Sequence, residues 1–177
     1  MSQILTHKGI MFDPIHPQVE LIDIEDIAHA LALLCRANGH FRTFYSVGMH
    51  CINCAAEAAA RGYDREVQLA CLLHDASEAY LSDVTRPVKQ VMPQYLQIEA
   101  PLQEMIWEKW LGHPLQEQQR IRVFAIDDAV LYREFETLMG ARLVENPPAL
   151  LAEPRCEFPG FQETEAEFLR LFLELIS

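Results

Sequence analysis

The sequence predicts an all-α fold, a helical bundle preceded by a short extended arm. Apolar residues recur at helical spacing in most segments after residue 22, and residues typical of helix ends separate these segments. Only the first 22 residues and one proline-containing loop leave room for strands. The chain has 177 residues, half of them hydrophobic, which suits one domain with a core better than two. We therefore expect a single domain over 1–177, with an arm at 1–22, a core at 23–143 and a C-terminal loop and helix at 144–177.

The first elements are expected in the N-terminal third of the chain. Residues 1–22 mix a glycine and two prolines with apolar residues, which is typical of an extended arm or a short hairpin. Acidic residues then precede an apolar stripe with helical spacing, and the Asn-Gly pair at 38–39 ends this first helix. A second helix is expected over 43–60, because its apolar stripe is followed by Arg-Gly at 61–62.

The remaining helices follow from capping residues, periodicity and prolines. A third helix is expected to begin at the cap residue Asp64 and to continue to about residues 80–82. The loop at 83–89 contains a proline at a turn or helix start. Pro101 is expected either to kink or to restart the helix in which it lies. The later helices are expected at 94–111, 117–139 and 163–176.

Composition bears on partners and on the cellular compartment. The chain has 26 acidic and 14 basic residues, for a net charge of -12, so a nucleic acid polymer would be repelled. Small anions that are held locally remain compatible with this charge. Five cysteines, an odd number, lie mostly within apolar patterns and indicate reduced thiols. Because no signal-like segment or uninterrupted apolar run is found, we expect a cytoplasmic protein with no membrane partner.

The most informative feature is the pair His74-Asp75, which directly follows an apolar run. Burying an imidazole beside a carboxylate is costly unless something such as a metal ion satisfies both groups. In a helical bundle, His50 from the second helix and Asp127 from the long helix would lie beside this pair. Taken alone, His50 would be an ordinary core histidine, but beside the His-Asp pair we interpret it as a ligand. Two imidazoles and one or two carboxylates suit a divalent ion such as Co, Mn, Mg, Zn, Ni or Fe.

The spacing along the expected third helix adds a further carboxylate to this site. Consecutive helical residues point about 100° apart, so His74 and Asp75 share an ion only if it lies over the seam between them. Glu78 lies one turn beyond His74, within reach of a water molecule or a leaving group. We therefore interpret Glu78 as a candidate general acid or base.

This pattern resembles the HD-domain metal-dependent phosphohydrolases, and specifically their 5'-nucleotidase-like branch. The similarity covers most of residues 9–140, and its motifs are most specific over 74–78 and 83–89. The other matching segments are Asp26-Ile27-Ala28-His29-Ala30-Leu31, Cys35-Arg36-Ala37-Asn38-Gly39-His40, Phe44-Tyr45-Ser46-Val47, and Asp127 followed by Leu131 and Glu134.

The resemblance implies a role for each candidate residue. Glu78 would assist the reaction, Arg36 would hold phosphate and Asp83 would help to select the sugar. The planar guanidinium of Arg36 suits phosphate oxygens, which matters in a chain that is otherwise negative. The branch also implies a homodimer. The ligands implied for a single divalent ion are His50, His74, Asp75 and Asp127.

Several residues keep more than one interpretation. Asp127 and Asp128 both qualify as a ligand, and we choose Asp127 because its spacing to later residues of the same helix fits the family better. Lys89, together with Arg86, either faces the substrate phosphate or forms a solvated pair on a loop, and we assign Lys89 to substrate binding. The two cysteines at 51–54 resemble a redox or zinc motif, but in mid-helix without a second pair we interpret them as packing residues.

We therefore expect a phosphohydrolase that uses metal-activated water to hydrolyse a phosphomonoester, specifically a ribonucleoside or deoxyribonucleoside 5'-monophosphate. Two-metal HD enzymes need additional histidines between the His-Asp pair and the last aspartate, and only His113 lies in that interval, which favours a single ion. One alternative is a non-catalytic nucleotide-binding or sensor protein that retains the pocket. Another is a helical interaction protein with a structural ion. The presence of Glu78 favours the enzyme.

Overall fold

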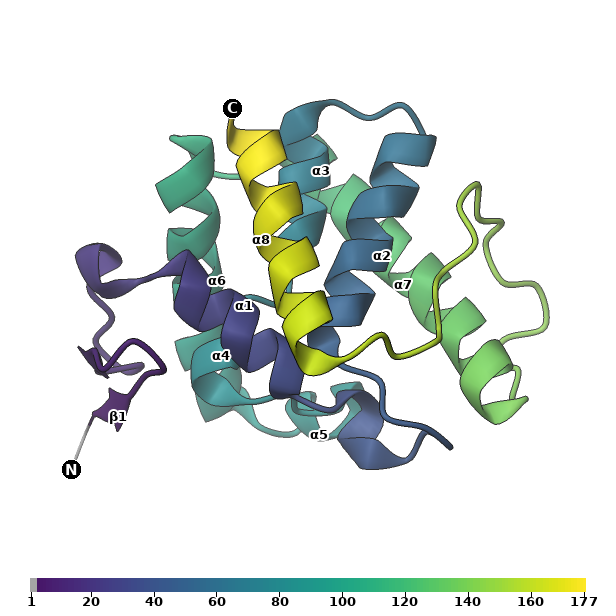
Figure 1. The fold of residues 1–177 in the computed structure, drawn as a ribbon, viewed down its shortest axis with the longest axis horizontal. Coiled ribbons are helices and arrows are strands. Elements are labelled where there is room, and N and C mark those ends of the chain that lie inside the picture. The colour runs from purple at the N-terminus through teal and green to yellow at the C-terminus, as the bar shows by residue number, and fades with distance from the viewer. Residues whose placement is uncertain (1–2) are drawn as a thin grey trace.

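The computed structural model describes residues 3–177, which form a helical fold with one small sheet (Figure 1). The predicted all-α class is confirmed. The helices are α1 (Ile24–Leu33), α2 (Val47–Ala60), α3 (Arg65–Leu72), α4 (Glu78–Leu81), α5 (Arg86–Lys89), α6 (Pro93–Leu111), α7 (Glu117–Met139) and α8 (Phe161–Ile176). The short 3-10 helices are η1 (Val19–Leu21) and η2 (Arg36–Gly39).

The N-terminal arm contains a short antiparallel hairpin. Strand β1 (Ile4–Leu5) pairs with β2 (Met11–Phe12), with Ile4 opposite Phe12. Gly9 in the connecting turn has a φ of 79°, a left-handed conformation that favours glycine. Phe12 is fully buried and stacks on Tyr80 of α4, with the ring centroids 4.1 Å apart, so the hairpin is anchored to the bundle. Of the arm expected at 1–22, residues 1–2 lie outside the part that the structure describes.

The bundle is built around α2 and α3, which pack against each other. α8 packs on one side of this pair and α7 on the other (Figure 1). α1 contacts both α2 and α8. Gly48 allows α2 to approach α1 closely, because a Cβ atom at this position would lie only 3.1 Å from the backbone oxygen of Leu31 in α1. Apolar side chains fill the space between these helices and form the main core.

Several helix boundaries agree closely with the sequence prediction. α7 spans Glu117–Met139 as expected, and α8 begins at Phe161 rather than residue 163. α2 begins at Val47 rather than near residue 43, because Ser46 caps it by accepting a hydrogen bond from a backbone N–H of the first turn. α6 continues through Pro101, which excludes a restart at this proline.

The first helix is shorter than the sequence predicts. α1 ends at Leu33, well before the Asn-Gly pair at 38–39. Cys35 instead forms an isolated antiparallel bridge with Ser46, and these backbone hydrogen bonds replace the helical ones. The chain then turns through η2, which begins at Arg36. The early end of α1 therefore brings Arg36 back against the start of α2.

The prediction of one continuous helix through the His-Asp pair is wrong. α3 ends at Leu72, and residues 73–77 form turns before α4 begins at Glu78. The buried side chain of Gln103 on α6 stabilises this break. Its amide donates to the carbonyl oxygen of Leu73 at 2.8 Å, and its own oxygen accepts from the backbone N–H of Ser77 at 3.1 Å. The periodicity of residues 64–82 does not reveal a partner on a distant helix.

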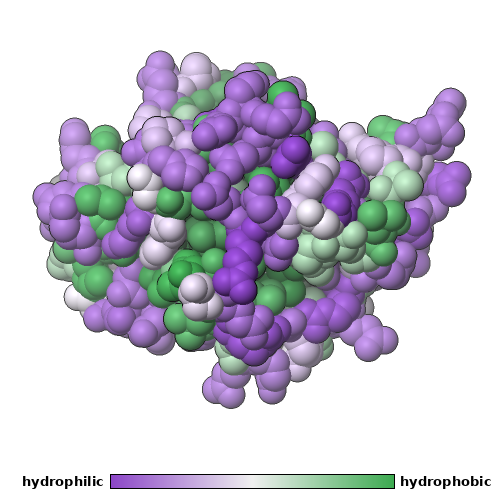
Figure 2. Space-filling model, turned by 90° about the horizontal axis from the view of Figure 1, so that it is seen from above, coloured by the Kyte–Doolittle hydropathy of each residue, from purple (hydrophilic) through white to green (hydrophobic). Residues whose placement is uncertain are grey.

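Apolar side chains outside the core are dispersed over the surface. Figure 2 shows one face, on which they form several patches separated by hydrophilic side chains. Within residues 3–177, none of the helices combines the length and the hydropathy that crossing a membrane requires.

Candidate metal centre

His50 lies on α2 at the centre of the bundle and is fully buried. Its Nδ1 atom is 2.9 and 3.0 Å from the two carboxylate oxygens of Glu134 on α7. Glu134 is also fully buried and accepts a hydrogen bond of 2.6 Å from the hydroxyl of Tyr45. Because Nδ1 donates its proton to Glu134, the lone pair of Nε2 is directed to the opposite side of the ring.

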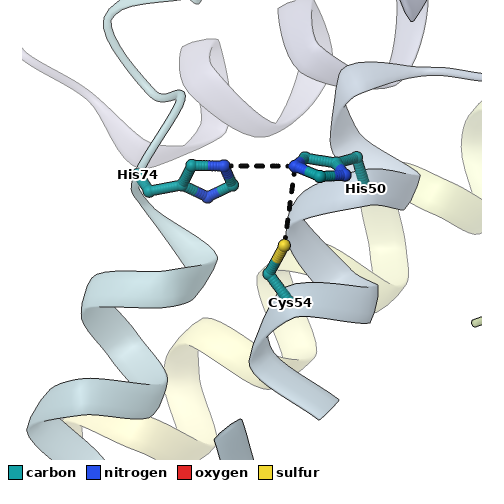
Figure 3. Close-up of side chains that lie close together, drawn as sticks. All are labelled: His50, Cys54 and His74. Carbon is teal, nitrogen blue, oxygen red and sulfur yellow. Dashed lines mark hydrogen bonds between the residues drawn. The ribbon is translucent and has the colours of Figure 1, made fainter. Parts of the chain in front are cut away.

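His74 occupies the turn between α3 and α4 and is held in a similar way. Its Nδ1 atom lies 2.7 Å from the backbone oxygen of Cys71, which accepts the proton of that nitrogen. The Nε2 atom therefore points away from α3 and towards His50. The two Nε2 atoms are 3.2 Å apart, and Figure 3 shows a nitrogen of each ring pointing towards the other ring.

Two carboxylates complete this cluster. Asp127 of α7 places Oδ1 3.0 Å from Nε2 of His50 and 3.8 Å from Nε2 of His74. Asp75, in the same turn as His74, places Oδ2 3.3 Å from Nε2 of that histidine. Asp128 instead pairs with Arg86 at 2.7 Å. The structure thus brings together the four groups predicted as ligands, and it places Asp127 rather than Asp128 beside the imidazoles.

The guanidinium of Arg36 lies among these four groups. Its Nη2 atom is 2.9 Å from Nε2 of His50 and 3.5 Å from Oδ1 of Asp127, and its Nη1 atom donates to Oδ2 of Asp75 at 3.1 Å. Burial alone would raise the pKa of Asp75, but the neighbouring His74 and Arg36 outweigh it and hold this pKa well below its usual value. The acceptor atoms of the cluster therefore form a local site for positive charge.

The donor set fits a divalent metal ion. Histidine ligands in metal sites usually donate their other ring N–H to a carboxylate or a backbone carbonyl, which fixes the ring, and His50 and His74 both do so. Nitrogen and oxygen ligands of this kind suit borderline and hard divalent ions. The sequence calls for His50, His74, Asp75 and Asp127 in this role, and these are the residues that would hold the ion.

Two thiols also lie within reach of the cluster. The Sγ atom of Cys54 is 3.5 Å from Nε2 of His50, and these two residues form a group with His74 that could hold a metal ion (Figure 3). Cys51 belongs to a second such group, with His74 and Asp75. Both cysteines are buried in the core, which agrees with their interpretation as packing residues. Burial raises the pKa of Cys54 well above its usual value, so it remains a neutral thiol.

Glu78 begins α4 and faces a cavity of about 910 Å³ that is also lined by Arg36, His74, Asp75 and Asp127. Its carboxylate is buried, and its Oε2 atom has no hydrogen-bond partner among residues 3–177. Burial, together with the charges of Asp75 and Asp83, raises the pKa of Glu78 well above its usual value. The positive charges of Lys89 and Arg36 oppose this shift but do not reverse it, so this carboxyl group holds a proton to a higher pH than an ordinary glutamate does.

The other predicted substrate-binding residues line the same cavity. Asp83 is partly buried, and this burial is the main reason that its pKa is raised. Lys89 is held by two carboxylates, donating to Glu78 at 2.9 Å and also to Glu99. Lys89 is therefore not half of a solvated pair with Arg86. Its ammonium group is bound by two carboxylates, and the residue lines the cavity.

Sequence reasoning missed three residues that organise the site. Glu134 is noted in the motif but is given no role, although its position seven residues after Asp127 places it on the same face of α7. Gln103 and Glu99 receive no attention, because they act through contacts with the turn at 73–77 and with Lys89. A polar residue in an otherwise apolar helical stripe is the signal that would have drawn attention to Gln103.

Comparison with known proteins identifies relatives without a stated activity. No family model matches this chain. It is 36% identical over 110 residues to the uncharacterized protein YfdR of Escherichia coli (strain K12), a region that covers 62% of this chain and 59% of that protein. It is 38% identical over 101 residues to an uncharacterized protein of Rhodobacter capsulatus, covering 54% of this chain and 51% of the relative. The chain thus spans between one half and three fifths of the length of these curated relatives.

Proposed function

We propose that this protein is a metal-dependent phosphohydrolase that cleaves a nucleoside 5'-monophosphate. The observation that carries the proposal is the meeting of two imidazole Nε2 atoms, two carboxylates and Arg36 in one cluster. Arg36, His74, Asp75 and Asp127 of this cluster line one cavity, and His50 is buried directly behind them. The order of these residues along the chain resembles the HD-domain phosphohydrolases of the 5'-nucleotidase-like branch. A divalent ion bound there would lower the pKa of a water molecule and offset charge on the phosphoryl group.

Arg36 is the residue proposed to bind the phosphate. Its guanidinium lines the cavity and carries a positive charge in a chain whose net charge is -12. A planar guanidinium can donate two parallel hydrogen bonds to phosphate oxygens, which orients the phosphoryl group as well as attracting it. Its contacts with Asp75 and Asp127 keep it next to the proposed ligands.

Glu78 is the residue proposed to supply a proton. As the oxygen of water attacks phosphorus, the bond to the 5'-oxygen breaks, and this oxygen takes up the proton held on Glu78. The proton that the water loses then restores the acid form of Glu78, so protons balance over the cycle. The raised pKa of Glu78 is what an acid needs at neutral pH. Lys89, which contacts Oε1 of Glu78, fixes the direction of the other carboxyl oxygen.

The rest of the cavity suits a nucleoside. Its volume of about 910 Å³ lies in the range of small-molecule sites, and it is lined mainly by apolar atoms beyond the polar cluster. Phe124 and Tyr132 of α7 offer aromatic faces for a base. Asp83, which lines the cavity, can accept a hydrogen bond from a sugar hydroxyl.

A phosphatase assay tests this proposal. Purified protein is loaded with Co, Mn or Mg, its metal content is measured, and phosphate release is followed on a panel of ribonucleoside and deoxyribonucleoside monophosphates. We expect release from at least one member. The change Glu78→Gln should lower kcat by about a hundred-fold to ten-thousand-fold while nucleotide binding persists. Glu108→Gln, which removes the same charge from an exposed site on α6, should leave kcat unchanged.

The same experiment addresses the alternative of a nucleotide sensor. Metal-loaded protein that binds nucleotides without releasing phosphate from any of them would favour the sensor and count against the enzyme. If neither binding nor release is observed with any ion, both proposals fail.

A further inference from the structure

A second group of potential metal ligands lies outside the centre described above. His7 comes from the hairpin turn, His29 from α1 and Glu165 from α8. Their ligand atoms all lie within 4.8 Å of one another. The two imidazole rings stack with centroids 3.6 Å apart, and Nδ1 of His29 is 2.9 Å from Oε2 of Glu165. Three elements that are distant in the sequence thus contribute to one cluster.

A buried carboxylate beside this cluster has an unsatisfied oxygen. Asp26 precedes His29 by one turn of α1 and is only 3% exposed. Its Oδ1 atom accepts a hydrogen bond of 2.7 Å from the backbone N–H of Lys8, but Oδ2 has no partner within residues 3–177. Asp26 lines a cavity of about 160 Å³ together with His7 and His29. An unpaired anionic oxygen is costly to bury, so this cavity favours a cation.

The charges around the cluster also favour a bound cation. The side chain of Lys8 is engaged by Asp23 and Glu25, each at 3.0 Å. Within the described part of the chain, Asp26 therefore has no basic side chain as a partner, and Glu165 has only His29. The local excess of carboxylates is a second reason for a cation to bind here.

We propose that His7, His29 and Glu165 form a second divalent metal site, with Asp26 as a charge partner. Imidazole nitrogens combined with a carboxylate suit Zn²⁺ and similar borderline ions. The proposal does not depend on the phosphohydrolase function, because it uses none of the residues of the first centre. Its consequence is structural, since an ion there would join the N-terminal hairpin to α1 and α8.

The stacked rings must rearrange to bind an ion. The lone pair of an imidazole nitrogen lies in the plane of its ring, so two parallel rings cannot both direct a lone pair at one ion. His7 is exposed in the hairpin turn and can rotate towards the adjoining cavity. His29 is already oriented by Glu165 and can exchange that contact for a shared ion.

Zinc titration of variant proteins tests this site. The wild-type protein, freed of metal, is titrated with Zn²⁺ by calorimetry, and bound zinc is measured after dialysis. We expect two ions per chain. The change His7→Ala, at an exposed position, should lower the zinc affinity of one site by at least about ten-fold and leave that of the other unchanged. His16→Ala, which removes another exposed histidine of the same segment, should retain both.

Hydrogen exchange supplies a readout that is independent of the first centre. Zinc should slow amide exchange in residues 4–12 of the wild-type protein but not of the His7→Ala variant, because only the former ties the hairpin to α1 and α8. His29→Gln should reproduce the His7→Ala result. Equal zinc stoichiometry and affinity in the wild type, His7→Ala and His29→Gln would overturn the second site. So would amide exchange in the wild-type hairpin that does not respond to zinc. Neither result would alter the outcome of the phosphatase assay.

Discussion

At the scale of single residues, the hydrogen-bond partners of His50 fix the orientation of its ring. His50 is fully buried, its Nδ1 atom is bound to the carboxylate of Glu134, and its Nε2 atom lies 2.9 Å from the guanidinium of Arg36 and 3.0 Å from Oδ1 of Asp127. Histidines that bind metals are commonly held in this way, with the other ring nitrogen bound to a carboxylate. The ring of His50 is therefore oriented by Glu134 for binding on its other side.

The role of Glu134 leads to a prediction about metal affinity. The change Glu134→Gln removes the charge that fixes the Nδ1 proton of His50, so we expect metal binding at the first centre to weaken by about 10-fold to 100-fold. Competition with a fluorescent chelator measures this affinity. Glu136→Gln, which removes a carboxylate two residues along α7 that pairs with Arg142, is the matched control. Equal affinities in the two variants would contradict an orienting role.

The raised pKa of Glu78 leads to a prediction about pH dependence. Its protonated form is the active one in the proposed reaction, so kcat/KM should be retained below the pKa of Glu78 and should fall as pH rises through it. The residual activity of Glu78→Gln should lack this basic limb, because glutamine does not titrate. Asp128→Asn, which removes another carboxylate of the cavity wall, should keep it. A basic limb that survives in Glu78→Gln would assign the proton to another group.

At the scale of elements, the break between α3 and α4 determines the directions in which the side chains of His74 and Asp75 point. In a continuous helix, adjacent side chains diverge by about 100°. In the turn at 73–77, Asp75 and His74 both reach the cluster, with Oδ2 and Nε2 only 3.3 Å apart. Gln103 stabilises this turn because it accepts from the N–H of Ser77, which has no helical partner, and adds a second donor to the carbonyl oxygen of Leu73.

Removing the side chain of Gln103 should destabilise this turn. In Gln103→Leu, the buried N–H of Ser77 loses its partner, and the carbonyl oxygen of Leu73 keeps only its bond from the N–H of Ala76. We expect the free energy of unfolding to fall by about 1–3 kcal/mol. Urea denaturation measures the change. Gln97→Leu, at an exposed position of the same helix, should change it by less than about 0.5 kcal/mol. Similar losses in both variants would show that the turn does not rely on Gln103.

At the scale of the whole molecule, the sequence predicted the all-α class and most helices, because each long helix has its own apolar stripe and end signals. It also identified His50, His74, Asp75 and Asp127 as a group, and these side chains meet in the structure. Their identity as ligands stays a prediction, as do the reaction and the substrate. The grouping of these four side chains was thus accessible from the sequence.

The features that the sequence did not predict depend on contacts between distant segments. The early end of α1 follows from the bridge between Cys35 and Ser46, and the turn at 73–77 follows from Gln103. Neither has a local signal, since each partner belongs to another element. The same reason explains why the cluster of His7 with His29 and Glu165 was overlooked, because its members come from three separate elements.

The polar network behind His50 continues into the C-terminal loop. Asn53 donates to the hydroxyl of Tyr45 at 2.7 Å and exchanges two hydrogen bonds, of 3.0 and 3.1 Å, with the backbone of Arg155. The loop after α7 is thereby attached to the residues that hold the imidazole in place. A fragment that ends at residue 143 would consequently lose one support of the His50 ring, and proteolytic cleavage near Arg155 would weaken the same support without altering any residue of the cluster.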